Sequence, residues 1–383
     1  MLSVIKIGSL MNHILIVGSS GKDEHFKIDS FYKLPEEFHP FLKKTIPVSQ
    51  INKLLGSEWS KEKVYSVLEN YSISPVHYSY GGRAPHVAYG VARLGGNTRL
   101  ITTFGRDYDF PYPGFFDGGY YSHLMRSNVG MRLAIVENSS KIDSLDFEKL
   151  NSGVWVVMDK TTSTISCIKD KENNEFFIID DVDGASGVEK TRPLPEAEFE
   201  NANMLFVTSS ETPFMKSSIL EARKRGIDVI VDVASYGVTE DYARVMVPNS
   251  KIILGNDNEI KQLIDFLKLR DIDEIFTVGS EYPHAVILED KLNGLIEILY
   301  RNSESSKIGP VYFEKTGNAI GCCDGIATGI LIGLQKGLTL EKACKIGLME
   351  AYSIWKVEGV QEGMLSLEEL KKLYTKFFKE VPF

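Results

Sequence analysis

The stretch TGNAIGCCDGIATGILIGLQKGL (Thr316–Leu338) joins a polar loop, two adjacent cysteines and one carboxylate, Asp324, to a run of small and aliphatic residues. This run is typical of a buried helix that packs closely against its neighbours. The free N–H groups and partial positive charge at such a helix start bind anions and favour an ionised carboxylate. The stretch therefore predicts an anion site beside a carboxylate. Taken alone, it is explained more simply by a carboxylate that caps its own helix.

Short aliphatic runs that end in glycine or polar residues recur on both sides of this helix. They are HILIVGSSG (13–21), NTRLITTFG (97–105), NMLFVTSS (203–210), DVIVDVAS (228–235), SKIILG (250–255), DEIFTVGS (273–280) and PHAVILED (283–290). Helical patterns lie between several of them, as at 213–226 and 256–271. This alternation predicts an α/β protein with a doubly wound, mostly parallel sheet covered on both faces. Functional residues in such folds gather at the carboxyl ends of the strands.

Two regions break the alternation. Residues 24–80 hold a helical piece, SKEKVYSVLENYS, between extended segments, and residues 130–182 read as consecutive strands joined by polar turns. Parts of both regions are predicted to form a small β-rich lid over the main sheet. Residues 1–383 are expected to form a single domain with this lid as its appendage.

Composition excludes several classes of function. The 383 residues carry a formal net charge of −9 and no basic stripe, which argues against nucleic-acid binding. The longest apolar run, Ile326–Leu334, is too short to span a membrane. The start of the sequence does not read as a secretory leader, so the four cysteines are expected to be reduced in a cytoplasmic protein.

A second informative stretch is YGGRAPHVAYGVARLGGNTRLITTFGRD (Tyr80–Asp107). With it, the chain resembles the ribokinase (PfkB) family of small-molecule kinases. The family's first signature, Gly-Gly-x-x-x-Asn-x-Ala followed by Leu-Gly, is matched at five positions: Gly81, Gly82, Ala88, Leu94 and Gly95. Its second signature, Asp-Thr-x-Gly-Ala-Gly-Asp, falls on residues 318–324 and is matched at Gly321 and Asp324.

Further matches follow in the family's order, from about residue 13 to about residue 372, with 36–72 left as an unmatched insertion. Asp23 stands where the family has a sugar-contacting aspartate after its first strand. Asn256 and Glu259 match the Asn-x-x-Glu motif, whose glutamate acts on magnesium mainly through water. Thr277 and Gly279 stand where the family has a strand-end loop for the nucleotide.

The resemblance implies a ribokinase-like three-layer fold and transfer of the γ-phosphate of ATP to a hydroxyl of a sugar or nucleoside. In that assignment Asp324 is the catalytic base, and the backbone of Gly321, Cys322 and Cys323 forms the anion hole. Mg²⁺ is expected between the phosphates and the Asn256–Glu259 region. Lids of this family often pair between subunits, so a homodimer is one expectation for this chain.

The acceptor side is predicted to contain Asp23, Gly81, Gly82, Arg83 and His86. His86 replaces the family's asparagine, which faces the substrate, and a satisfied buried histidine is an equal alternative. Arg83 is read either as a ligand for a substrate or phosphate oxygen or as a solvated side chain.

Other departures bear on activity. Cys322 and Cys323 replace Ala-Gly in the anion hole, and their amides rather than their sulfurs are expected to act. Asn318 and Ala319 replace Asp-Thr, and Tyr282 replaces a glycine of the nucleotide loop. The alternative function is a ribokinase-like binding or regulatory protein with impaired catalysis. Use of ADP as the donor is a third possibility.

Overall fold

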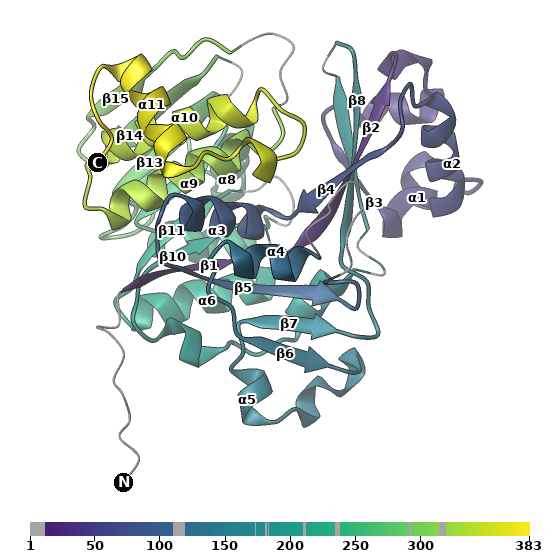
Figure 1. Cartoon of the computed structure of the whole chain (residues 1–383), viewed down its shortest axis with the longest axis horizontal. Helices are drawn as coiled ribbons and strands as arrows, with labels where there is room; N and C mark the ends of the chain where they lie inside the picture. The colour runs from purple at the N-terminus through teal and green to yellow at the C-terminus, as the bar shows by residue number, and fades with distance from the viewer. Residues whose placement is uncertain are drawn as a thin grey trace.

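Ten strands form the central sheet of the computed structural model, in the order β15-β14-β13-β12-β11-β10-β1-β5-β7-β6 (Figure 1). The structure describes residues 12–109, 119–172, 174–180, 182, 184–209, 212–233, 238–290, 293–313 and 319–383. The strands are β1 (His13–Val17), β5 (Thr98–Gly105), β6 (Leu133–Val136), β7 (Val154–Val157), β10 (Ala202–Val207), β11 (Asp228–Asp232), β12 (Ile252–Gly255), β13 (Ala285–Asp290), β14 (Leu295–Tyr300) and β15 (Ser305–Ile308). All neighbouring pairs are parallel except β13–β14 and β14–β15.

Helices cover both faces of this sheet because its strands are apolar on both sides. In β1, Ile14 and Ile16 pack against one set of helices, whereas Leu15 and Val17 pack against the other. The first set is α3 (Arg83–Arg93), α4 (Tyr120–Arg126), α9 (Cys322–Gln335), α10 (Leu340–Ile354) and α11 (Leu367–Phe378). The second set is α6 (Thr212–Lys224), α7 (Glu240–Asn249) and α8 (Asp257–Leu267). The predicted three-layer α/β architecture is confirmed.

A separate five-stranded sheet has the order β3-β9-β8-β2-β4. Its strands are β2 (Gly21–Ile28), β3 (Thr45–Pro47), β4 (His77–Gly81), β8 (Thr164–Asp170) and β9 (Glu175–Ile179). Strand β2 starts four residues after β1 ends, and β4 ends two residues before α3 starts, so both connections to the central sheet are short. This small sheet corresponds to the predicted lid.

The segment predicted as an insertion, about 36–72, covers one face of the small sheet. It supplies β3 and the helices α1 (Ile51–Leu55) and α2 (Lys61–Tyr71), and Figure 1 shows these helices on the far side of the sheet from α3. Phe38, Trp59 and Leu68 pack there against Phe176 and Ile178 of β9. The small sheet therefore has an apolar core of its own.

One detail differs from expectation. The segment DEIFTVGS, predicted as a strand, forms the 3-10 helix Asp273–Thr277, and Ile275 and Phe276 are buried in the same apolar cluster as Ile260 and Leu263 of α8. In the region 130–182, only β8 and β9 belong to the small sheet. Strands β6 and β7 extend the central sheet instead.

Helix α9 packs against α10 along the small residues that the sequence singled out. A side chain on Gly329 would collide with the backbone of Gly347, and one on Gly333 would collide with Ala343. This close packing fixes the amino end of α9 relative to the rest of the protein. Among the described helices, none is long and apolar enough to cross a membrane.

Candidate active site

The amino end of α9 is set by Gly321, whose φ of 78° lies in the left-handed region. A side chain at this position would also overlap Val360, so glycine is required for both reasons. Cys322 is fully buried, and its thiol lies 3.5 Å from the carbonyl oxygen of Ala351. The N–H of Cys322 donates to the carbonyl of Ala319 at 3.3 Å, so this amide of the predicted anion hole is already engaged.

Asp324, in the first turn of α9, is 4% exposed, and both of its carboxylate oxygens contact donors. Arg83 Nε donates to Oδ1 at 3.0 Å, and His86 Nδ1 lies 2.9 Å from Oδ2. Burial raises the pKa of Asp324, but the His86 hydrogen bond and the Arg83 charge outweigh this and hold the pKa below its ordinary value. The carboxylate is therefore ionised at neutral pH.

Arg83 connects this carboxylate to the central sheet. Its guanidinium also forms an ion pair with Asp232, the last residue of β11, and its side chain remains 23% exposed. Burial raises the pKa of the Asp232 carboxyl, and the Arg83 charge opposes that rise. Arg83 is thus neither a freely solvated side chain nor a remote one, because it lies against the predicted base.

His86 has a different environment from the one expected for a substrate-facing residue. It is 2% exposed, and its Nε2 lies 2.7 Å from the carbonyl oxygen of Tyr80. Since Nδ1 contacts Asp324, both ring nitrogens are used inside the protein. The structure thus places His86 against the predicted base, with both ring nitrogens satisfied as in the second of the two alternatives for this residue.

The small sheet brings Asp23 and the glycine pair together. Gly21 pairs with Gly81 between β2 and β4, and a side chain at Gly81 would overlap the carboxylate of Asp23. Gly82 has a φ of 91°, which the turn into α3 requires. Burial raises the pKa of Asp23 to about 7, and the Asp324 charge adds to the rise while His86 opposes it.

Two further histidines lie near Asp23. His25 follows Asp23 by two residues in β2 and therefore projects from the same face of the sheet. Its Nε2 lies 2.9 Å from Ser79 Oγ, and its ring centroid lies 5.6 Å from that of His77. Burial lowers the pKa of His25 to about 4, helped by His77 and His86. In the sequence, the spacing of Asp23 and His25 by two residues in a strand already indicates that both side chains lie on one face of the sheet. This pattern was not used in predicting the site.

Asn256 and Glu259 form a capping box at the start of α8. The Asn256 side chain accepts from the N–H of Glu259 at 3.1 Å, and Glu259 Oε2 accepts from the N–H of Asn256 at 2.9 Å. Glu259 is buried, so it is not a simple exposed helix carboxylate. The pair follows β12 at the same carboxyl edge of the sheet as Asp232.

These residues do not form a metal cage. No group of three or more histidine, cysteine, aspartate or glutamate residues in the described ranges is placed to hold a metal ion. One oxygen of Glu259 is already used by its capping box. A magnesium ion here would therefore have to be held mainly by nucleotide phosphates and water, which is a usual arrangement for Mg²⁺.

Thr277 and Gly279 lie at the opposite edge of the sheet. They precede β13, whose first residue, Ala285, pairs with Ile252 at the start of β12. The Thr277 hydroxyl donates to Glu274 O at 2.8 Å, and the carbonyl of Gly279 accepts from Arg301 at 2.7 Å. The expectation that these two residues follow a strand at its carboxyl end is wrong, because the segment before them is helical.

At the carboxyl edge, β13 ends at Asp290, and Asn293 and Gly294 precede β14. Gly294 has a φ of 59°, and Asp290 Oδ1 accepts from the N–H of Asn293 at 3.1 Å. Tyr282, predicted to replace a glycine of the nucleotide loop, lies with Thr277 at the other edge. Asn318, which stands at the first position of the second signature, lies outside the described residues.

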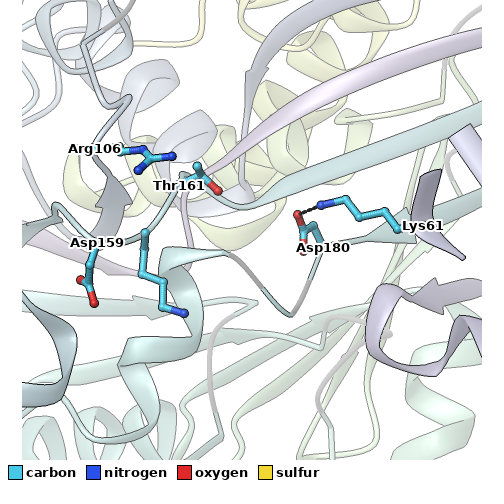
Figure 2. A pocket seen from close by; sticks show the side chains of 6 residues that line it. Lys61, Arg106, Asp159, Thr161 and Asp180 are labelled. Carbon is cyan, nitrogen blue, oxygen red and sulfur yellow. Dashed lines mark hydrogen bonds and ion pairs between the residues drawn. The ribbon is translucent and has the colours of Figure 1, made fainter.

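A polar cavity of about 280 Å³ lies beside the predicted lid, as Figure 2 shows. It is lined by Lys61, Arg106, Asp159, Lys160, Thr161 and Asp180. Lys61, at the start of α2, forms an ion pair of 2.8 Å with Asp180, just after β9. None of the predicted site residues lines this cavity, so it is separate from the cluster around Asp324.

Solved structures similar to this chain are kinases. The nucleoside kinase of Methanocaldococcus jannaschii, described as an archaeal member of the ribokinase family, matches with a TM-score of 0.69 at 18% identity. The matched region covers 96% of this chain and 100% of the kinase. The nucleoside kinase of Burkholderia thailandensis in complex with inosine has a TM-score of 0.68 at 18% identity, covering 96% and 99%. A ribokinase of Thermotoga maritima has a TM-score of 0.65 at 18% identity, covering 95% and 99%.

Other neighbours include ribokinases solved with ADP, and with ribose and ATP. No protein-family model and no curated protein matches the sequence. The chain therefore has the ribokinase fold, as its divergent signatures predicted. At this level of identity the similarity establishes the fold, while the activity must be argued from the residues.

Proposed function

We propose that this protein is a ribokinase-type kinase that transfers the γ-phosphate of ATP to a hydroxyl of a sugar or nucleoside. The observation that supports this most directly is the ionised, almost fully buried carboxylate of Asp324 at the start of α9, in contact with Arg83. The nucleoside and sugar kinases among the structural neighbours support the same class.

In the proposed reaction, the acceptor hydroxyl gives its proton to Asp324 as its oxygen forms a bond to the γ-phosphorus. The bond between that phosphorus and the bridging oxygen breaks, and its electron pair stays on the β-phosphate of ADP. Backbone amides at the start of α9 and the Arg83 guanidinium stabilise the charge of the phosphoryl group as it moves. Such positioning of charge supplies most of the catalysis in phosphoryl transfer.

The acceptor is proposed to bind between the small sheet and α3. Asp23 would accept hydrogen bonds from its hydroxyls, beside the Gly81–Gly82 turn. The nucleotide would lie at the carboxyl edge near Asn256 and Glu259, with Mg²⁺ neutralising its phosphates. Asp290, Asn293 and Gly294, rather than Thr277 and Gly279, are proposed to lie beside the nucleotide.

The test is the Asp324→Asn variant, assayed for ADP release with Mg-ATP against a panel of sugars and nucleosides. We expect turnover to fall by about 10²-fold or more while acceptor affinity is kept, since an amide cannot take the proton. Asp241→Asn is the matched control, because Asp241 is an exposed carboxylate in the first turn of α7, away from the proposed site. Absence of turnover by the unmodified protein with every acceptor would contradict the proposal.

A second candidate is a binding or regulatory protein that has kept the fold and lost the chemistry. Two features favour it: the engaged amide of Cys322 and the side chain that Cys323 adds to the anion hole. Such a protein would show ligand-dependent thermal stabilisation with no ADP release, and Asp324→Asn would change neither. The third possibility, a kinase that uses ADP as the phosphoryl donor, is tested by assaying the same panel with ADP in place of ATP.

A further inference from the structure

His86 lies between two groups that can only accept hydrogen bonds. Its Nε2 is 2.7 Å from the carbonyl oxygen of Tyr80, and its Nδ1 is 2.9 Å from Oδ2 of Asp324. A neutral imidazole has one N–H and can therefore donate to only one of these oxygens. Both bonds form together when both ring nitrogens carry a proton, or when the carboxyl itself is protonated.

We propose that His86 is a positioning residue for Asp324: a doubly protonated ring that anchors to Tyr80 and holds the carboxylate by Oδ2. This inference rests on the proposed role of Asp324 as the base. It assigns to His86 a function other than substrate contact. It also explains how a histidine serves at a position where the family resemblance has asparagine.

The charged and titratable groups around His86 favour this form of the ring. Asp324 faces it from α9, Asp23 and His25 face it from β2, and Arg83 precedes it on α3. Burial lowers the pKa of His86, but the hydrogen bond and charge of Asp324, joined by Asp23, raise it above the ordinary 6.5. The neighbouring His25 adds little repulsion at neutral pH, because its own pKa is lowered to about 4.

The two bonds also fix the plane of the carboxylate. His86 holds Oδ2 and Arg83 holds Oδ1, and each oxygen keeps a second lone pair with which to accept a proton. The bond from His86 to Tyr80 ties this geometry to β4, which ends at Gly81 and leads into α3 through Gly82. The acceptor site and the base are thereby held in one arrangement.

Amide substitutions separate the two hydrogen bonds. The amide nitrogen of asparagine is as far along the side chain as Nδ1, so His86→Asn can keep the bond to Asp324 and loses the bond to Tyr80. Glutamine reaches the position of Nε2, so His86→Gln can keep the bond to Tyr80 and loses the bond to Asp324. Neither amide titrates, so the pair also removes the pH dependence that the ring imposes.

The first experiment is nitrogen NMR of the ¹⁵N-histidine-labelled protein, which needs no turnover. We expect both nitrogens of His86 to be protonated at pH 6.5, with a titration midpoint above 6.5 that falls in Asp324→Asn. The sign follows from the charge: removing the carboxylate removes the partner that stabilises the imidazolium. A ring that is neutral at pH 6.5 in the unmodified protein would overturn the inference, whether or not kinase activity is found.

The second experiment is the pH profile of kcat and KM for the two variants. If catalysis needs the doubly protonated ring, kcat of the unmodified protein falls at alkaline pH as His86 loses a proton. We expect His86→Asn to have a kcat within about tenfold of that of the unmodified protein and to lack this fall, because asparagine does not titrate. His86→Gln is expected to lower kcat by about 10²-fold with KM nearly unchanged, as for a misplaced catalytic group. Equal activity of the two variants would also overturn the inference. Absence of activity in the unmodified protein would instead count against the proposed function and leave the NMR result standing.

Discussion

Arg83 and Asp232 form an ion pair between the first residue of α3 and the last residue of β11, and the Asp232 side chain in it is almost fully buried. The same guanidinium donates to Asp324, so one cation contacts two buried carboxylates. Removing one partner of a buried ion pair leaves a charge without compensation, which destabilises a protein more than the pair itself stabilises it.

The first prediction follows from this shared cation. Arg83→Met is expected to lower the free energy of unfolding by about 3–5 kcal/mol, because Asp232 loses its ion-pair partner and Asp324 keeps only His86. Asp232→Leu should lower the free energy of unfolding by a smaller amount, because Arg83 still forms its ion pair with Asp324. In the double variant the two effects should not add, and denaturant titration of all four proteins gives the coupling energy.

The control for this cycle is an exposed pair. Arg244 and Glu240 are one helical turn apart on α7, with both side chains about half exposed, so Arg244→Met should change stability by less than about 0.5 kcal/mol. Strict additivity of Arg83→Met and Asp232→Leu would show that the buried pair is not energetically coupled.

The sequence allowed the central sheet to be predicted because its strands are apolar on both faces and alternate with helices. It also placed Asp324 at the start of a buried helix, because a lone carboxylate before a run of small residues is a local signal. The pairing of Arg83 with Asp232 could not be predicted, since it joins residues 149 positions apart through the fold. The segment at 273–280 was mistaken for a strand because a short apolar run has no decisive periodicity.

The second prediction concerns the start of α9. Gly321→Ala should destabilise the protein by about 1–3 kcal/mol and lower kcat more than KM, because the left-handed φ and the contact with Val360 both resist a side chain. Gly337, just after the same helix, has a φ of 74° but open space around it. Gly337→Ala should therefore show the backbone strain alone and leave kcat unchanged. An equal loss of kcat in both variants would argue that the amino end of α9 has no special role.

The third prediction concerns Glu350, a fully buried carboxyl on α10. Burial raises its pKa to about 8, although Glu350 accepts a hydrogen bond from the N–H of Leu365 at 3.1 Å. The folded state therefore keeps a proton that the unfolded chain loses at its ordinary pKa of 4.5. This contribution to stability is fully present below pH 4.5 and is lost as the pH rises through about 8.

Glu350→Gln removes the titration, so it should stabilise the protein by about 4 kcal/mol at pH 8 and have little effect at pH 4.5. The measurement is the difference in unfolding free energy between variant and unmodified protein across that pH range. Taking the difference cancels the contributions of the other titrating groups to the unfolding free energy. A difference that does not change with pH would refute the raised pKa.

The fourth prediction tests whether the small sheet depends on its own apolar core. Phe38 is fully buried, with its ring centroid 5.1 Å from that of Trp59 and 5.7 Å from that of Phe176. Phe38→Ala should cost about 3–5 kcal/mol of local packing. Hydrogen exchange is expected to speed up in β8 and β9 while β10 and β11 of the central sheet stay protected. Equal loss of protection in both sheets would mean that they unfold as one unit.

The last prediction concerns Asp23 and rests on the proposed acceptor site. Because the pKa of Asp23 is raised to about 7, the fraction of ionised carboxylate grows as the pH passes through this value. An ionised carboxylate accepts stronger hydrogen bonds from hydroxyl groups than a neutral carboxyl does. Acceptor affinity, measured by calorimetry, should therefore rise between about pH 6 and pH 8, and Asp23→Asn should abolish this dependence.

Glu24→Gln is the matched control, because Glu24 points to the opposite face of β2 and accepts from Ser166 at 2.9 Å. If Glu24→Gln removed the pH dependence and Asp23→Asn kept it, the acceptor would have to lie on the other face of the small sheet, where the insertion packs.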